Sequence, residues 1–563
     1  MRYKNQFEIG RRLVLSLLAG LLLVSSALAQ KNVAPSNPVI GSQNTVTADP
    51  PIARPTTTPC IVSLFSNYDF ADFSAKSFTY NPPACAGPWA KVVLEADFSI
   101  DAGRQFDRTA NIWIGGTNVY FGTTAEPSHT VSRSWHVEND LTDYSPLFTS
   151  TQDGSVDIGN LVNGTYTSVI HGSAQLLFYP VASGASAPQT ADVVLPLSAG
   201  ANGGSVLLFS PTDKLSRTFT LPNNIERAYL DVIAQGQSAN DEFWYTCVPD
   251  ALSNELQSCA GTAFRETEVS IDGKPAGVAP VYPWIFTGGI DPYLWRPIVG
   301  IQTLNFTPYR VDLSPFAAVL SDGQPHSVSL SVFNDHVYFS TTASLLLYLD
   351  HGSTQVTGGL TANTVGTPNP KVATNVTTDS SGNVTGTVSV NSNRQFKVAG
   401  YVNTSHGRVD TQVVQNINFS NSMQFDITSN YVQEIVQNTK IGSTTTSQSK
   451  GQMNVNVTEQ QWPLTLNYSF VGYPDGSAAQ IVSLTEGYNR HDVNTGSGRP
   501  AYVSDINVTN SPADTLVFSD TTFPQDQSST ERYQFKDNIG GCWDRTLTAS
   551  GGELTSFIDG CKK

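Results

Sequence analysis

Residues 327–332 read Ser-Val-Ser-Leu-Ser-Val, and this strict alternation of polar and apolar side chains is the pattern of a half-buried β-strand. The same period of two returns in residues 92–98, 112–114 and 455–457. Sustained helical periodicity is scarce, and residues 431–440 fit a short helix or a strand. With 44 Gly and 32 Pro to supply turns, the sequence predicts an all-β protein.

Three shifts in composition divide the chain of 563 residues, which is longer than one hydrophobic core requires. Segments rich in Gly, Ala, Ser, Thr or Pro are expected to be linkers or unstructured leaders. The predicted order is a signal peptide at 1–29, a disordered Pro/Thr-rich leader at 30–59, a first β domain at 60–181, a linker at 182–204, a second β domain at 205–351, a linker at 352–370 and a C-terminal β-rich domain at 371–563.

The first residues have the layout of a secretory signal. Arg2 and Arg11-Arg12 are basic, residues 13–24 are almost wholly apolar, and Ala27-Leu28-Ala29 matches the small-residue cleavage pattern. We therefore expect the mature chain to begin near Gln30 and to be secreted or periplasmic, without a membrane anchor.

The charge balance excludes some classes of partner. Lys and Arg number 31 against 47 Asp and Glu, so the net charge is −16. Such a surface repels nucleic acid phosphates and anionic lipids. We expect a soluble monomer that binds neither nucleic acid nor membrane.

Six cysteines in a chain marked for export predict disulfides. Proximity in sequence suggests the pairs Cys60/Cys85, Cys247/Cys259 and Cys542/Cys561, although six cysteines allow about 15 pairings. A zinc site is the alternative, but CxxC and HExxH are absent and the eight histidines are scattered. We predict no metal and no cofactor.

Carboxylates and aromatic side chains carry the remaining chemistry, because GxSxG, Walker and GxGxxG motifs are absent. The candidates gather in residues 103–108, 123–127, 240–245 and 286–297.

Asp107 stands between Arg104 and Arg108 before a strand-like run, where functional groups often lie. Spacing alone favours a surface ion pair for it.

Asp241 and Glu242 precede Phe243-Trp244-Tyr245, and such apolar neighbours can keep a carboxylic acid protonated for general-acid work. The two residues fit equally well a structural aspartate in a turn followed by a solvent-exposed glutamate.

Tryptophan can stack on a sugar, but it is also an ordinary core residue. Trp295 is the better ligand candidate because Gly and Pro surround it, whereas most of the group Trp113, Trp135, Trp244 and Trp284 fit a core. From position alone, Glu266 is an acid at the edge of a strand.

Taken together, these segments resemble the acidic, almond-type peptide:N-glycosidases and their low-pH bacterial members. The motifs, in the family's order, are Gly103 to Arg108, Thr124 to Pro127, Val137 to Asp140 with Tyr144-Ser145, Asn240 to Tyr245, Arg265-Glu266 with Ile271 to Gly273, Phe286 to Pro297, Asp312 to Phe316, and Gly400 to Val402 with Thr404 to Arg408. The resemblance adds candidate substrate-binding residues: Arg104, Arg108, Glu126, Trp244, Arg265, Glu266, Trp295 and Arg296.

A fainter resemblance is to the F-type bacterial enzymes, which consist of two eight-stranded jelly rolls. It implies two consecutive jelly-roll domains here and makes Asp107 the catalytic carboxylate, since Phe106-Asp107-Arg108 is similar to their Trp-Asp-Arg segment. Their second catalytic glutamate falls on Gly261, so Glu242 and Asp241 are the substitutes.

The family resemblance implies hydrolysis of the amide between the innermost GlcNAc and Asn of N-glycosylated peptides and proteins, in acid. Asp107 would activate water while a protonated Glu242 or Asp241 assists departure of the glycosylamine. Two alternatives stay open: a glycoside hydrolase with paired carboxylates, and a non-catalytic glycan-binding protein.

Overall fold

The computed structural model describes residues 38–519 and 525–561, and it consists mainly of antiparallel strands grouped in sheets. The predicted all-β class is confirmed. The predicted signal peptide and residues 30–37 of the predicted leader lie outside the described residues.

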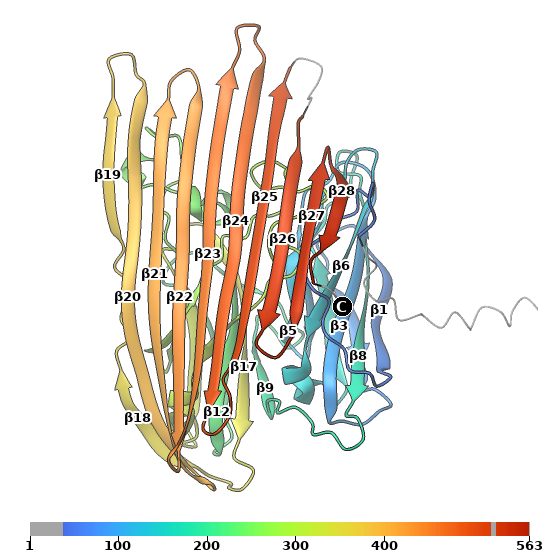
Figure 1. Ribbon diagram of the computed structural model, residues 1–563, viewed down its shortest axis with the longest axis vertical. Helices are drawn as coiled ribbons and strands as arrows, with labels where there is room; N and C mark the ends of the chain where they lie inside the picture. The colour runs from blue at the N-terminus through green and yellow to red at the C-terminus, as the bar shows by residue number, and fades with distance from the viewer. Residues whose placement is uncertain (1–37, 520–524, 562–563) are drawn as a thin grey trace, which may run out of the picture. The chain divides into compact units, whose positions relative to one another are not determined.

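The first sandwich spans residues 60–180 and pairs two four-stranded sheets (Figure 1). One sheet contains, in spatial order, β1 (Cys60–Phe70), β8 (Ile170–Pro180), β3 (Trp89–Ile100) and β6 (Arg133–Asp140). The other contains β2 (Lys76–Tyr80), β7 (Gln152–Ile158), β4 (Thr109–Ile114) and β5 (Thr117–Thr123). Val92, Leu94, Ala96 and Phe98 of β3 are buried in one cluster with Ile112 of β4, so the predicted alternation does mark the core face.

The second sandwich follows the same plan. One sheet contains β10 (Val206–Leu208), β17 (Tyr338–Leu349), β12 (Ile225–Gln237) and β15 (Tyr309–Asp312), with β9 (Val193–Leu197) also paired to β17. The other contains β11 (Leu215–Thr220), β16 (Pro325–Phe333), β13 (Glu266–Ile271) and β14 (Lys274–Pro280). Val328, Leu330 and Val332 of β16 are fully buried, which confirms the alternation read from residues 327–332.

Short helical segments occupy the connections of both sandwiches. They are η1 (Thr142–Phe148), α2 (Ser238–Glu242), η2 (Trp244–Thr246), η3 (Asp250–Leu252), η4 (Ser314–Phe316) and α3 (Ala317–Leu320). None of those in the described ranges is long and apolar enough to cross a membrane.

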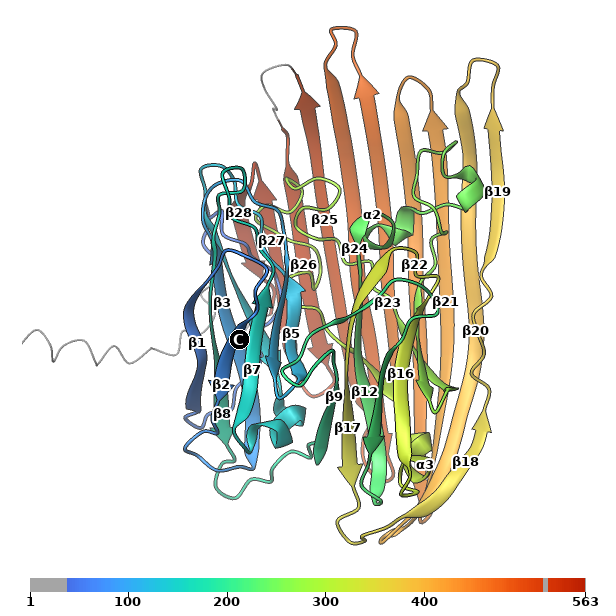
Figure 2. The ribbon, with the colours of Figure 1, turned by 180° about the vertical axis from the view of Figure 1, so that it is seen from behind.

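The C-terminal region forms a single 11-stranded sheet whose long central strands run side by side (Figures 1 and 2). Its strands are β18 (Thr357–Asn363), β19 (Lys371–Thr378), β20 (Val384–Thr404), β21 (Gly407–Ile427), β22 (Tyr431–Ser449), β23 (Gln452–Gly472), β24 (Ala478–Gly496), β25 (Tyr502–Phe518), β26 (Ser528–Asp537), β27 (Cys542–Ser550) and β28 (Glu553–Asp559). Residues 431–440, open between helix and strand in the sequence, belong to β22.

One face of this long sheet packs on the second sandwich. Phe419 of β21 contacts the rings of Trp244 and Phe264 at centroid distances of 6.1 and 5.0 Å. The Asn421 side-chain amide donates to the carbonyl of Tyr245 at 2.9 Å. Burial in β21 therefore alternates along almost its whole length.

Two predictions about connections were wrong. The expected linkers 182–204 and 352–370 each contain a strand, β9 and β18, because an unpaired edge of β17 and of β20 accepts them. Composition cannot anticipate an edge that distant residues supply.

The leader is also not disordered over residues 39–59. The Arg54 guanidinium binds Glu95 and Glu138 at 2.6 Å each, and Val46 forms a parallel bridge with Ile298. The Ala48 amide donates to the Glu531 carboxylate at 2.8 Å. The Pro/Thr-rich composition predicted disorder because such a segment has no core of its own, but here it is held by ion pairs and hydrogen bonds to three β regions.

Three disulfides join Cys60 to Cys85, Cys247 to Cys259 and Cys542 to Cys561, as proximity in sequence suggested.

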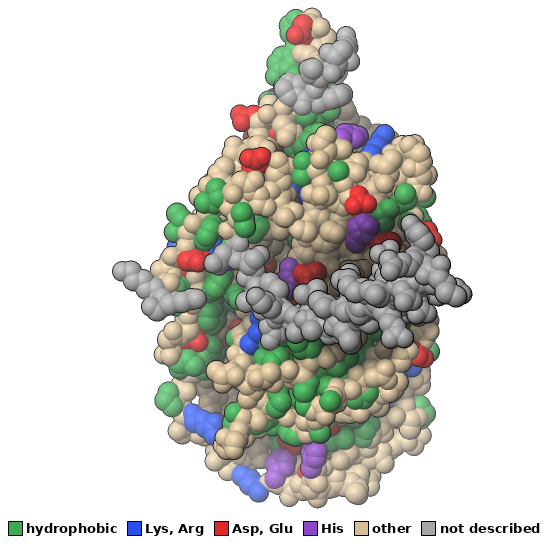
Figure 3. Space-filling model, turned by 90° about the vertical axis from the view of Figure 1, so that its right-hand side faces the viewer, with side chains coloured by type: hydrophobic (Ala, Val, Ile, Leu, Met, Phe, Trp, Pro, Cys, Tyr) green, Lys and Arg blue, Asp and Glu red, His purple; other side chains and the backbone are tan. Residues whose placement is uncertain are grey.

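Charged side chains are dispersed on the face of the molecule shown in Figure 3, where basic groups are few and stand apart. The coloured side chains visible in this view form no continuous basic stripe of the kind that follows a phosphate backbone.

Candidate active site

Asp107 and Glu126 are brought together by the β4–β5 hairpin. Strand β4 begins two residues after Asp107, and β5 ends three residues before Glu126. The amide of Arg108 donates to the Thr124 hydroxyl at 2.9 Å, and the Thr124 amide donates to the Arg108 carbonyl at 2.8 Å. The ladder thus continues past both strand ends, and it places the amide of Asp107 3.1 Å from the Glu126 carboxylate.

The two carboxyl groups lie close enough for each to shift the pKa of the other. Glu126 is buried and donates a hydrogen bond to Asp107. Burial raises the pKa of Glu126, and the negative charge of Asp107 raises it further. Burial also raises the pKa of Asp107, and two neighbouring carboxylates repel each other, so one group of the pair stays protonated over the acid range.

Residues 286–297 close over this pair. The hydroxyl of Thr287 donates to the Thr124 carbonyl at 2.7 Å, and the Gly288 amide donates to Asp107. A Cβ on Gly288 would lie 2.5 Å from Glu126 Oε1 and 2.6 Å from Asp107 Oδ1, so any larger residue here would have to displace the two carboxyl groups.

Arg296 supplies positive charge beside the pair. Its guanidinium donates to the Pro127 carbonyl at 3.1 Å, stacks over the Tyr293 ring at 4.8 Å, and lowers the pKa of Glu126 against the stronger effect of burial. The Nε atom is buried without an acceptor among the described residues.

Glu242 is the third acid of the site. It ends α2, a short helix that begins when the chain leaves β12 through Ser238 at a φ of 65°. Burial and the charge of Asp107 raise the pKa of Glu242 to about 7. Glu242 therefore lies within electrostatic reach of Asp107 and is protonated in acid.

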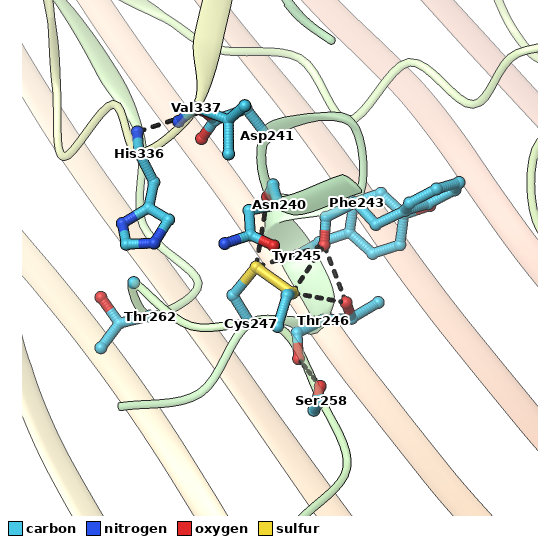
Figure 4. Close-up of a disulfide and its surroundings, with 12 residues drawn as sticks. Asn240, Asp241, Phe243, Tyr245, Thr246, Cys247, Ser258, Thr262, His336 and Val337 are labelled. Carbon is cyan, nitrogen blue, oxygen red and sulfur yellow. Dashed lines mark hydrogen bonds between the residues drawn. A yellow bond between two sulfur atoms is a disulfide. The ribbon is translucent and has the colours of Figure 1, made fainter. Parts of the chain in front are cut away.

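Asp241 lies elsewhere, although it is the next residue. Its side chain is fully buried, accepts from Arg265 Nε at 3.0 Å and from the His336 amide at 3.1 Å, and sits beside the Cys247–Cys259 disulfide segment (Figure 4). Arg265 also donates to the carbonyls of Thr262 and Phe264. Asp241 and Arg265 thus form a buried ion pair that fixes the loop, and the structure does not bring either of them to Asp107.

Three other predicted substrate-binding residues are also enclosed. Trp244 packs against Phe419, and Trp295 is buried and donates from Nε1 to the Gly289 carbonyl at 2.9 Å. Glu266 is buried and paired with Arg394 of β20. Gly and Pro around Trp295 correctly marked a loop, but this loop is packed under a sheet, so its tryptophan holds the loop instead of facing solvent.

Three aromatic side chains near Asp107, those of Phe73, Phe106 and Tyr166, were not predicted from the sequence to belong to the site. Phe106 and Phe73 are 44% and 65% exposed. The ring of Tyr166 lies 5.4 Å from that of Phe106 and 5.6 Å from the Arg104 guanidinium, while Arg108 lies 6.0 Å from the ring of Phe73. The signal available in the sequence was the phenylalanine directly before the candidate catalytic aspartate.

In the described ranges, no cluster of three or more His, Cys, Asp or Glu side chains is arranged to hold a metal ion. The chemistry available from these residues is acid–base chemistry with a guanidinium nearby.

Comparison with known proteins identifies the family of the chain. Residues 50–366 match the family model described as peptide N-acetyl-beta-D-glucosaminyl asparaginase amidase A. The chain is 31% identical, over 78% of its own length and 79% of the relative's, to peptide-N4-(N-acetyl-beta-glucosaminyl)asparagine amidase A of Prunus dulcis.

Solved structures are more distant. PNGase F, a glycosylasparaginase from Flavobacterium meningosepticum, is 14% identical with a TM-score of 0.35 over 52% of this chain and 96% of that one. PNGF-II is 13% identical with a TM-score of 0.35 over 52% and 65%. On the family match and the almond relative together, the chain belongs to the peptide N-acetyl-beta-D-glucosaminyl asparaginase amidase A family.

Proposed function

We propose that this protein hydrolyses the amide bond between the innermost GlcNAc and the asparagine side chain of N-glycosylated peptides and proteins. The observation that carries the proposal is the pair of carboxyl groups of Asp107 and Glu126, held by the hydrogen bond from the Asp107 amide to Glu126 at 3.1 Å and lying against the backbone of Gly288, in a chain of this family. The exposed ring of Phe106 and the half-buried ring of Tyr166 beside it offer apolar faces on which sugar rings stack.

Asp107 acts as the base. Its ionised carboxylate takes a proton from water as the water oxygen bonds to the amide carbon. Burial raises the pKa of Asp107, while the Gly288 amide, the charge of Arg108 and the hydrogen bond from Glu126 act against burial and favour the ionised form. The charge of Arg296 stabilises the oxyanion that forms on the carbonyl oxygen.

Glu242 acts as the acid. Protonated below a pKa of about 7, it passes its proton to the leaving nitrogen as the carbon–nitrogen bond breaks. The products are a peptide with aspartate in place of asparagine and a 1-amino sugar, which then loses ammonia. This division of labour requires acid conditions, because Glu242 must hold a proton while Asp107 is ionised.

A glycopeptide digest in water enriched in heavy oxygen tests the proposal. Mass spectrometry should find aspartate carrying one heavy oxygen atom and the intact glycan in solution. Sugar left on the asparagine would instead identify a glycoside hydrolase, and binding with no product would identify a glycan-binding protein.

We also propose that the protein works outside the cytoplasm. The three disulfides and the signal-like first 29 residues support export. Fractionation of the producing cells, with detection of a mature N-terminus near Gln30, tests this.

A further inference from the structure

The active-site loop, residues 286–297, lies against the long C-terminal sheet. Two polar side chains of β24 and β25, Gln480 and Asp514, reach the loop at Asp291, and two more, Glu486 and Asn510, bind the residues that follow it. Glu486 accepts from the Ile301 amide at 2.9 Å, and Asn510 donates to the Val299 carbonyl at 2.8 Å. The sheet therefore fixes the segment that carries Gly288 and Arg296.

The central contact joins two acids. Asp291 of the loop is fully buried, and Asp514 of β25 is almost fully buried. Asp291 accepts from the Tyr293 amide at 2.9 Å and from Gln480 Nε2 at 3.1 Å, which leaves it the acceptor of the pair. Neither carboxyl oxygen of Asp514 has a hydrogen-bond partner among the described residues, and a buried carboxylate without a donor is costly. A proton on Asp514, directed at the neighbouring Asp291, would satisfy both groups.

The surroundings favour one proton for the two groups. Burial raises the pKa of Asp514, and the charge of Asp291 raises it further. Burial raises the pKa of Asp291 as well, against the hydrogen bonds that it accepts and the positive charge of Arg296. The Tyr468 side chain on β23 also lies near Asp291. The backbone amides of Thr515 and Asp526 lower the pKa of Asp514, but their effect is smaller than that of burial.

We infer that the C-terminal sheet is a positioning element for catalysis: the proton shared by Asp514 and Asp291 holds residues 286–297 so that Gly288 and Arg296 meet the Asp107–Glu126 pair. Loss of this proton places two negative charges in contact beneath the loop. The loop then separates from β25, and the amide of Gly288 and the guanidinium of Arg296 move from the acids.

This inference rests on the proposed function, since turnover is its first readout. Activity should fall at high pH for two reasons: Glu242 loses its proton, and the remote carboxyl pair of Asp514 and Asp291 loses the proton that it shares. Asp514 touches no substrate, and its role is tested by a conservative variant.

Asp514→Asn is the decisive variant, because an amide of the same shape donates to Asp291 at every pH. We expect kcat in acid within about threefold of the parent protein and an alkaline limb moved upward by roughly half a pH unit or more. Asp514→Ala, which removes the donor, should lower kcat at all pH values with a smaller change in KM. Glu531→Gln is the matched control: Glu531 is an equally buried acid on β26 that faces the leader at Ala48, and its loss should leave the profile of kcat unmoved.

An unchanged alkaline limb in a folded Asp514→Asn protein overturns the inference while leaving the amidase function intact. If the parent protein has no amidase activity, the proposed function is wrong. The shared proton can then still be tested by carbon-13 NMR of labelled aspartate carboxyl groups. One resonance that titrates well above the normal aspartate range in the parent and vanishes in Asp514→Asn supports it, and its absence refutes it.

Discussion

Glu126 accepts a hydrogen bond from the amide of Asp107 and returns one to its side chain, although 19 residues separate them. A residue joined to its neighbour through both backbone and side chain cannot adjust one contact without losing the other. The proposed base is thus oriented before any substrate arrives, and this preorganisation is where a small polar site gains most of its catalytic effect.

Asp107→Asn should abolish most of the turnover. The amide keeps the shape but cannot accept the proton of water, so kcat should fall by about two to four orders of magnitude while glycopeptide still binds. Product release by mass spectrometry and binding by calorimetry measure the two effects. If Asp107 were only the partner of a surface arginine, the change would cost well under about 1 kcal/mol of stability and leave turnover near normal.

Glu242→Gln should remove the acid that serves the leaving group. We expect kcat to fall by roughly a hundredfold or more, and the residual rate to lose the decline that the parent protein shows through about pH 7. Asp241→Asn is the control on the adjacent residue. It disrupts a buried ion pair and should cost about 3–5 kcal/mol of stability without changing the shape of the pH profile. The reverse pattern would make Asp241 the acid.

Gly288→Ala should damage the site and spare the fold. The new methyl group would meet only the ends of two carboxyl side chains, which can move, so stability should change little while the shared proton geometry is lost. We expect a loss of tenfold or more in kcat, by about 1.4 kcal/mol per factor of ten. Gly472→Ala, where a Cβ meets nothing within 4 Å, is the control. Full activity of Gly288→Ala would mean that the loop does not close as described.

Thermal stability should be higher in acid than at neutral pH. Burial raises the pKa of Glu531 well above normal and that of Glu486 to about 7, so their contribution is complete below about pH 4.5 and is lost as pH rises through the folded-state values. Glu138, whose pKa is lowered by His136 and Arg54 against the cost of burial, acts in the opposite direction as pH falls.

Calorimetry from about pH 4 to about pH 8 should therefore show a fall in the melting temperature of roughly 5 °C or more. Glu531→Gln should flatten part of this slope. A melting temperature that rises steadily over this range would contradict the assignment of these acids as buried and protonated.

The pairing of Asp107 with Glu126 could in principle be predicted. Gly115-Gly116 lies between two apolar runs, and both residues have positive φ, 56° and 78°, as a two-residue hairpin turn requires. Counting outward from that turn places Glu126 near Asp107. The sequence reading named both residues but set Glu126 aside as a substrate contact because it did not use the turn to fix the register.

The separation of Asp241 from Glu242 could not be predicted. The two acids are neighbours in a five-residue helix, where adjacent side chains point in different directions. Strands later in the chain determine which of the two acids pairs with Arg265 and which one lies near Asp107. Trp295 shows the same limit: its loop was correctly recognised, but whether a loop residue is buried depends on what packs over it.

The hydrogen bond from the Gly41 amide to the Leu554 carbonyl has a consequence for biosynthesis. Residues 39–49 can make this contact only after β28 has been synthesised, more than 500 residues later in the chain. A chain that stops before β28 keeps β24 and β25, and with them the contacts to Val299 and Ile301, but leaves the Gly41 amide without the Leu554 carbonyl. Truncation before β28 should therefore weaken the attachment of residues 39–49 and spare the support of the active-site loop.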